Sequence, residues 1–113
     1  MPYIYEIAFD ISPEQMGELQ VGKSLARTAG YLKVRLPARP GFITSDAEYS
    51  VDDPSATRVV FRSEWSSWED LEEHRSSSLL EDEVLKEFEP YVRMTDMSAR
   101  VYAKVGSGPL RGY

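Results

Sequence analysis

The clearest structural signal in the sequence lies in residues 57–74, TRVVFRSEWSSWEDLEEH. Its first half, residues 57–65, places Val59, Phe61 and Trp65 on one side and charged residues on the other. A period of two in a segment rich in β-branched and aromatic residues predicts a β-strand. The second half changes to a helical pattern, so the chain is expected to pass directly from a strand into a helix.

Helical signals occupy the sequence after this strand. Ser66 and Glu69 have the spacing of a capping box, which predicts a helix that runs to about His74. Ser78 and Glu81 repeat the spacing, so we place a break in the serine run 76–78 and a second helical segment after it. That segment is expected to end at Pro90, and its apolar stripe consists of Leu80, Val84, Phe88 and Tyr91.

Three further strands and one helix are predicted in the remaining sequence. Ser12, as N-cap, followed by Pro13 and Glu14, predicts the start of a helix that Pro37 ends. Asp and Pro in residues 52–55 predict the turn of a hairpin. Alternation predicts strands over residues 3–11, 42–51 and 96–105.

The resulting order is β-α-β-β-α-β. This order predicts an α+β domain of ferredoxin-like topology, in which one antiparallel four-stranded sheet carries the helices on a single face. The domain is expected to span residues 1–105, and residues 106–113 are expected to form a flexible tail.

Composition excludes several classes of function. The net charge of −6 over 113 residues disfavours binding to nucleic acid or to an anionic membrane surface, and no apolar run is long enough to span a bilayer. There is no cysteine and His74 is the only histidine, so thiolate sites, and a multi-histidine metal site within one chain, are excluded. The acidic residues between Glu81 and Glu89 are interpreted as a solvated helix face rather than a metal site. We expect no metal and no cofactor, and a cytoplasmic location.

Two segments resemble a known family. Residues 36–43, LPARPGFI, are similar to the Pro-Gly-Phe entry into the second strand of antibiotic biosynthesis monooxygenase-like domains, and residues 61–74 are similar to their third strand and second-helix start. The resemblance implies a homodimer whose two sheets pack face to face into an α/β barrel, with a ligand cleft between sheet and helices. Some members oxidise polycyclic aromatic compounds with dioxygen and without metal or flavin. Related haem-degrading proteins carry an axial histidine late in the second helix, where residues 81–89 have none.

The resemblance also suggests site residues. Trp65 and His74 match the family's spacing between a strand-end aromatic residue and a helical histidine. On this basis His74 is the candidate catalytic base, because an imidazole with a pKa near 6.5 can accept a proton near neutral pH. Trp65 would line the ligand pocket together with Tyr5, Tyr49 and Phe61. Two alternatives remain open. Trp65 is then a core residue, and His74 lies on the helix surface or in a dimer contact.

The sheet face opposite the helices is expected to be charged. Eight residues would share it, with mixed signs that permit pairing, and Arg62 with Glu48 is the pair we single out. They are Glu6, Asp46, Glu48, Arg58, Arg62, Glu64, Arg100 and Lys104. In a face-to-face dimer such pairs would lie in or beside the contact.

Two hypotheses of function follow. The first is a dimeric protein that binds a small apolar or aromatic ligand without catalysis. The alternative is a cofactor-independent monooxygenase that acts on an aromatic or quinol-type substrate. The two differ in whether a pocket opens beside Trp65 with His74 pointing into it.

Overall fold

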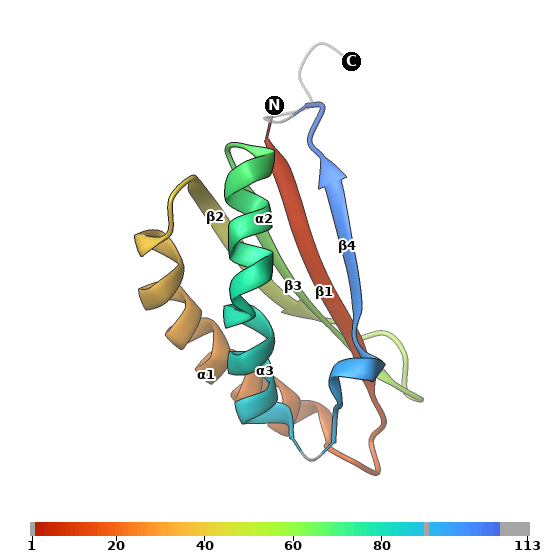
Figure 1. Cartoon of the computed structure of the whole chain (residues 1–113). Helices are drawn as coiled ribbons and strands as arrows, with labels where there is room; N and C mark the ends of the chain where they lie inside the picture. Colours follow the sequence, from red (N-terminus) through yellow and green to blue (C-terminus); the bar gives the residue numbers. More distant parts are fainter. Residues whose placement is uncertain (1, 90, 107–113) are drawn as a thin grey trace.

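The computed structural model describes residues 2–89 and 91–106. One sheet lies under a single layer of helices (Figure 1). The sheet order is β2-β3-β1-β4, and every neighbouring pair of strands is antiparallel. The predicted ferredoxin-like α+β fold is therefore confirmed. In chain order the elements are β1 (Tyr3–Ile11), α1 (Glu18–Arg35), η1 (Leu36–Ala38), β2 (Phe42–Tyr49), β3 (Thr57–Trp65), α2 (Trp68–Ser77), α3 (Leu79–Phe88), η2 (Met94–Asp96) and β4 (Ser98–Ala103).

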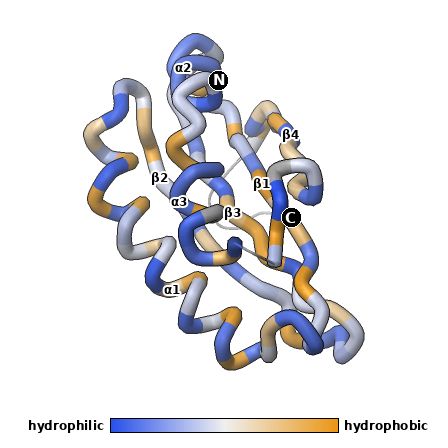
Figure 2. Tube along the Cα trace, turned by 60° about the horizontal axis from the view of Figure 1, so that its bottom comes forward, coloured by the Kyte–Doolittle hydropathy of each residue, from blue (hydrophilic) through white to orange (hydrophobic). Residues whose placement is uncertain are grey.

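The helix-facing side of the sheet carries the hydrophobic core. α1 lies over β2 and packs beside α3, whereas α2 lies over β1 and β3. Hydrophobic and hydrophilic positions alternate along α1, as expected for a helix with one buried face (Figure 2). The buried residues at the centre of this layer are Tyr5, Ile7, Phe9, Ile11, Val21, Leu25, Leu32, Val59, Phe61, Trp65, Leu71, Leu80, Val84 and Phe88.

The opposite side of the sheet, here called the open face, carries the predicted charges. The cross-strand register places Glu6 beside Arg62 and Arg100, and Asp46 beside Arg62. The predicted pair is confirmed: Arg62 Nη1 lies 2.6 Å from Glu48 Oε1, and Arg62 Nη2 lies 2.9 Å from Glu6 Oε1. Arg62 is thus held between carboxylates of two different strands.

The first helix begins later than predicted. Ser12 does close a turn, because the amides of Gln15 and Met16 donate to its carbonyl at 3.0 and 3.1 Å. The Gln15 side chain also turns back to accept a bond from the Ser12 amide at 3.0 Å, which completes this turn as a separate unit. Gly17 then adopts an extended conformation, and α1 starts at Glu18. Glycine has a low helix propensity, so it is a natural place for the interruption.

The cap of α2 lies one residue after the predicted position. Ser67, not Ser66, is the N-cap, and its Oγ accepts the Asp70 amide at 3.2 Å and donates to Asp70 Oδ2 at 2.9 Å. The Ser66 amide donates instead to the Gly41 carbonyl at 2.8 Å, which ties Ser66 to the neighbouring loop. The helix also continues beyond His74.

The predicted break between the two helices is present, but its mechanism differs. Ser78 adopts the left-handed conformation (φ 56°) at the end of α2, so it is not the N-cap of a capping box with Glu81. The Ser77 hydroxyl accepts the Leu79 amide instead, at 3.3 Å. The side chain of Glu81 is thereby left to bond elsewhere.

The apolar stripe after this break is confirmed only in part. Leu80, Val84 and Phe88 are buried, but Tyr91 is exposed and lies beyond α3, which ends at Phe88. Pro90, the predicted helix terminator, lies outside the described residues.

Two strands are shorter than predicted. β2 ends at Tyr49, and an irregularity in its pairing with β3 between Phe42 and Thr44 interrupts the alternation, so that Ile43 is exposed and Phe42 half-buried. β4 spans only Ser98–Ala103, because the chain before it forms η2. The predicted tail, residues 106–113, lies outside the described residues except for Gly106.

The loop into β2 depends on a glycine. Gly41 has φ +76°, and a Cβ atom at this position would clash with the side chain of Asp70 of α2. Both the backbone conformation and the close approach require glycine. Within the described part of the chain, no helix is long and apolar enough to cross a membrane.

Candidate functional site

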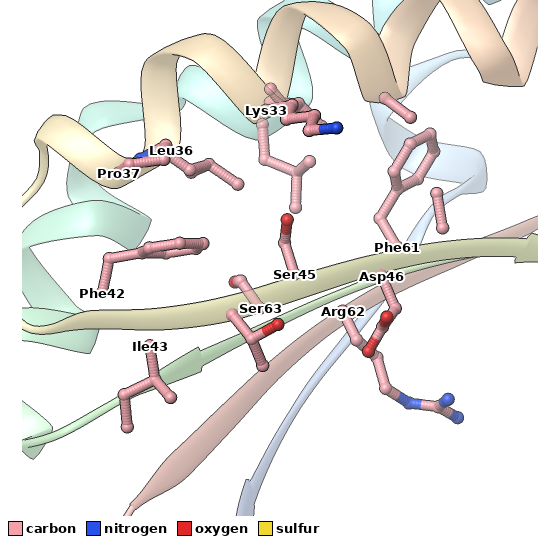
Figure 3. A pocket seen from close by; sticks show the side chains of 15 residues that line it. Lys33, Leu36, Pro37, Phe42, Ile43, Ser45, Asp46, Phe61, Arg62 and Ser63 are labelled. Carbon is pink, nitrogen blue, oxygen red and sulfur yellow. The ribbon is translucent and has the colours of Figure 1, made fainter.

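A cavity of about 410 Å³ lies between α1 with η1 and the part of the sheet formed by β2 and β3 (Figure 3). Leu32 and Leu36 form its roof, and Leu80 of α3 contributes to the wall. Phe42 and Phe61 stand at its two ends (Figure 3). The lining is therefore mainly aliphatic and aromatic, as is typical of small-molecule sites.

A few polar groups also reach the cavity. Ser45 of β2 points towards the helices, and Ser63, its register partner on β3, lies beside it (Figure 3). The amine of Lys33 lies on the helix side of the cavity, whereas Asp46 and Arg62 point to the opposite side of the strands (Figure 3). The polar groups inside are thus two hydroxyls, with one ammonium group near the mouth.

Small side chains leave this space unfilled. Ala29 of α1 and Ala47 of β2 both line the cavity, where longer side chains would take up part of the space between helix and strand. Elsewhere between the helices and the sheet, the ring pairs Phe9–Phe88 and Trp65–His74 fill the equivalent space. The cavity therefore arises from the local absence of large residues.

Trp65 and His74 lie in a packed cluster behind this cavity and do not line it. Their rings are stacked with centroids 4.5 Å apart and planes inclined by 23°, and their exposed fractions are 0% and 2%. The Tyr5 ring meets His74 edge-on at 5.9 Å. Two residues that line the cavity contact Trp65: Phe42 touches it edge-on at 5.6 Å, and the Ser63 hydroxyl accepts a hydrogen bond from Trp65 Nε1 at 2.9 Å.

The surface interpretation of His74 is wrong, because the residue is buried between Trp65 and Tyr5. Neither ring nitrogen has a hydrogen-bond partner within the described residues. Burial, and to a smaller extent the positive charge of Arg39, lower the pKa of His74 from 6.5 to about 4. The imidazole is therefore neutral at pH 7 and is a weak proton acceptor there.

A buried hydrogen bond joins β1 to α3 in the same cluster. The Tyr5 hydroxyl donates to Glu81 Oε1 at 2.6 Å. Burial, and then the bond to Glu81 and its negative charge, raise the pKa of Tyr5 well above 10, so the phenol remains protonated at neutral pH. The sequence did not predict this pair, because Glu81 belongs to a run of acidic residues and such a run indicates exposure to solvent.

The prediction that this acidic run is a solvated face is wrong for two of its members. Glu81 is buried against Tyr5, and Glu83, with an exposed fraction of 2%, pairs with Arg35 Nη1 at 2.8 Å and Lys86 Nζ at 3.3 Å. Residues 2–89 and 91–106 contain no group of three or more histidine or acidic side chains placed to hold a metal ion.

The structure separates the predicted site residues into two places. Phe61 lines the cavity, and Tyr49 lines a second hollow farther along α1. Tyr5, Trp65 and His74 belong to the packed cluster. Sequence reasoning missed Leu36, Phe42, Ser45 and Ser63. Ser45 lies on the same side of β2 as the predicted Tyr49, and this alternation is the signal that could have found it.

Sequence comparison and structure comparison give different results. No model of a known protein family matches the sequence, and no curated protein matches it either. Among solved structures, a Deinococcus radiodurans protein named for the antibiotic biosynthesis monooxygenases is similar with a TM-score of 0.64 at 12% identity, over 97% of this chain and 99% of that one.

Two oxygenases of Streptomyces have the same arrangement. A mutant of SnoaB, a cofactor-independent oxygenase of Streptomyces nogalater, matches with a TM-score of 0.59 at 10% identity, over 96% of this chain and 97% of that one. A monooxygenase from the gene ActVA-Orf6 of Streptomyces coelicolor, in complex with nanaomycin D, matches with a TM-score of 0.59 at 19% identity, over 95% and 90% of the two chains. The chain thus has the α+β fold of the antibiotic biosynthesis monooxygenase-like proteins.

Proposed function

We propose that this protein binds a small apolar or aromatic ligand in the cleft between α1 and strands β2 and β3, without catalysis. The observation that supports this proposal is the cavity of about 410 Å³ with aromatic ends and an aliphatic roof. Ligand sites in proteins commonly enclose roughly 300–1,000 Å³ and combine an apolar lining with a few polar groups.

The lining suits a flat ring that carries one or two oxygen atoms. Phe42 and Phe61 offer aromatic surfaces at the two ends, and the hydroxyls of Ser45 and Ser63 can bond to ring oxygens. Lys33 near the mouth favours an oxygen that carries negative charge. A hydroxylated naphthoquinone has these features.

The absence of catalysis in the proposal follows from the chemistry of the lining. Within the described residues, two serines and a lysine line the cavity but no histidine does, and Asp46 and Arg62, which border it, point to the opposite side of the strands. The single histidine, His74, is enclosed by Trp65 and Tyr5 and has a pKa of about 4. A general base needs to reach the proton that it removes.

The alternative is cofactor-independent oxygenation of an aromatic or quinol-type substrate. Two contacts favour it: Phe42 and Ser63 line the cavity and both contact Trp65, which in turn stacks on His74. A rotation of Phe42 and Trp65 would connect the ligand with the histidine. Oxygen uptake with a panel of hydroquinones tests this alternative, with His74→Ala and His74→Gln compared with the wild type. Equal rates in all three proteins would remove His74 from any mechanism.

Calorimetric titration with 2-hydroxy-1,4-naphthoquinone tests the binding proposal. In the variant Ala29→Phe the new ring occupies the cavity, so we expect affinity to fall at least tenfold. Ala26→Phe is the matched control, because Ala26 lies on the same helix, is exposed, and does not line this cavity. Binding by the wild type that Ala29→Phe leaves unchanged would refute the proposed location.

The proposal includes a homodimer formed through the open face. Arg62 with Glu48 and Glu6, and Lys104 with Glu64 at 2.7 Å, form a pattern of alternating charge that a second copy could match. Arg62→Glu would place three carboxylates together, and we expect it to sediment as a monomer. Arg93→Glu, at an exposed position outside the sheet, serves as the control. A wild type that is monomeric at micromolar concentration would refute the dimer.

The proposed location is the cytoplasm, whose reducing conditions suit a chain without cysteine.

A further inference from the structure

We propose that the ligand of this cleft consists of a ring and an attached apolar chain, with the ring in the cavity and the chain lying along α1 towards Tyr49. This inference rests on the proposed binding function. It adds the chemical class of the ligand, which a cavity for a ring alone would not specify.

The first observation is a second hollow of about 410 Å³ farther along the junction of α1 and β2. Ala29 and Ala47 line both this hollow and the cavity described above. The two spaces are therefore adjacent, with these two alanines at their common border. We call the combined space the α1 groove, with its proximal part under Leu36 and its distal part beside Gly22.

The second observation is the length of the α1 groove. Residues 22 and 36 stand at its two ends along the helix, which corresponds to roughly 21 Å at the helical rise of about 1.5 Å per residue. β2 runs alongside it from Phe42 to Tyr49. The groove is thus much longer than a two-ring aromatic system, and an extended chain is the simplest ligand part that would fill the remainder.

The third observation is the size of the residues along the groove. Gly22, Ala26 and Ala29 of α1 and Ala47 of β2 line the distal part, and all four are small. Tyr49 closes the distal part by lying against the helix, since a Cβ atom on Gly22 would be 3.1 Å from its hydroxyl oxygen. The distal part is therefore an open hollow lined by small residues, with Tyr49 at its far end.

Charge sets the direction of the ligand. Lys33 lies at the proximal part, where it can attract a negatively charged ring oxygen. Glu48 borders the distal part, but its carboxylate lies on the open face, where it is paired with Arg62 at 2.6 Å. The other residues that line the distal part carry no charge, so a charged group would find no partner there, and the distal part fits an uncharged hydrocarbon end.

A homologous series of ligands tests the inference. The probes are 2-hydroxy-1,4-naphthoquinones with methyl, butyl or octyl at carbon 3, titrated below their aggregation concentrations. Full burial of one methylene strengthens binding about fourfold, so a half-open groove should give about twofold per methylene and roughly 100-fold between methyl and octyl.

Two variants that obstruct only the distal part locate the chain. Ala26→Phe adds a ring beside the distal part, and Gly22→Val displaces Tyr49 into it. In both variants we expect the affinity for the methyl homologue to stay within twofold of that of the wild type. The octyl advantage, that is, the ratio of the affinities for the octyl and methyl homologues, should fall below tenfold. Thermal unfolding confirms that each variant is folded, and either variant alone is sufficient for the test.

The outcomes separate this inference from the proposed function. If all homologues bind with equal affinity, the chain has no site and the inference is overturned, while the ring site stands. If the octyl advantage persists undiminished in both variants, the chain binds elsewhere and the inference is again overturned. If no homologue binds at all, the proposed function itself fails.

Discussion

The helix layer covers the two halves of the sheet in different ways. Over β1 and β3, α2 presses His74 onto Trp65, and their rings stack 4.5 Å apart with almost no exposed surface. Over β2, α1 leaves a cavity of about 410 Å³. The same sheet therefore carries a filled half, the Trp65 cluster, and a hollow half, the α1 groove.

The difference shows where a ligand site can arise in so small a domain. Large aromatic residues fill the space that they reach, and protein interiors pack to the density of organic crystals. A cavity persists only where opposite residues are small, as at Ala29 and Ala47. Large aromatic side chains such as Trp65 thus mark the filled part of the core, and small side chains mark the cavity.

The largest effect is expected from truncation in the filled half. Trp65→Ala removes a fully buried ring that contacts His74 and Phe42. We expect the free energy of unfolding to fall by about 3–5 kcal/mol, measured by urea denaturation at pH 7. Trp68→Ala is the control, because Trp68 is 44% exposed, and its loss should be far smaller. Equal losses in the two variants would contradict the division into halves.

The second effect concerns pH. His74 has a pKa of about 4 in the folded protein and about 6.5 in the unfolded chain, so between these values the unfolded chain binds more protons. The contribution of the neutral, buried His74 to the free energy of unfolding is therefore fully present above pH 6.5 and is lost as the pH is lowered towards 4. At about 1.4 kcal/mol per pKa unit, the loss should reach roughly 3 kcal/mol.

The variant His74→Leu isolates this contribution from the titration of carboxylates. The difference between the unfolding free energies of wild type and variant is measured by urea denaturation from about pH 7.5 to about pH 4, the range that spans the two pKa values. It should be constant above pH 6.5 and shift in favour of the variant below it. A difference that stays constant across the whole range would show that the histidine is not buried in its neutral form.

The third effect concerns the bond between Tyr5 and Glu81. Tyr5→Phe leaves the buried carboxylate of Glu81 without its donor, so we expect a loss of about 1–3 kcal/mol in thermal or urea unfolding. Tyr102→Phe also removes a hydroxyl bonded to a carboxylate, Glu6 Oε2 at 3.1 Å, but at an exposed position, and should cost little. If the double variant Tyr5→Phe with Glu81→Leu were as unstable as Tyr5→Phe alone, the unpaired carboxylate of Glu81 would not be the cause of the lower stability of Tyr5→Phe.

The fold was largely predictable from the sequence, and particular residues show why. The alternation in β1 and β3 is regular, because one side of each strand is buried under helices, and the period of two reports this directly. The start of α1 was not predictable, because the Ser12 signal is real but ends after one turn at Gly17. Local helix-start signals indicate that a helix can begin, but they do not indicate how far it continues.

The site was much less predictable. The acidic and basic neighbours of His74 favour a surface position, yet α2 turns the residue inward onto Trp65. The acidic run around Glu81 favours exposure to solvent, although Tyr5, 76 positions earlier, reaches this carboxylate. Both errors involve contacts between elements distant in sequence, and neither composition nor periodicity reports such contacts.

The smallest effect is expected in the hollow half, and it completes the comparison. Ala29→Leu adds a larger side chain at the α1 groove, where space is already present, so the free energy of unfolding should remain within about 1 kcal/mol of wild type. Val84→Leu adds a single methylene to a fully buried position of α3 and should cost about 1–3 kcal/mol, because a packed core resists extra volume. Urea denaturation of both variants measures the contrast. If the smaller addition at Val84 is tolerated and the larger one at Ala29 is not, the space along α1 does not exist in solution, and the ligand site proposed there does not exist either.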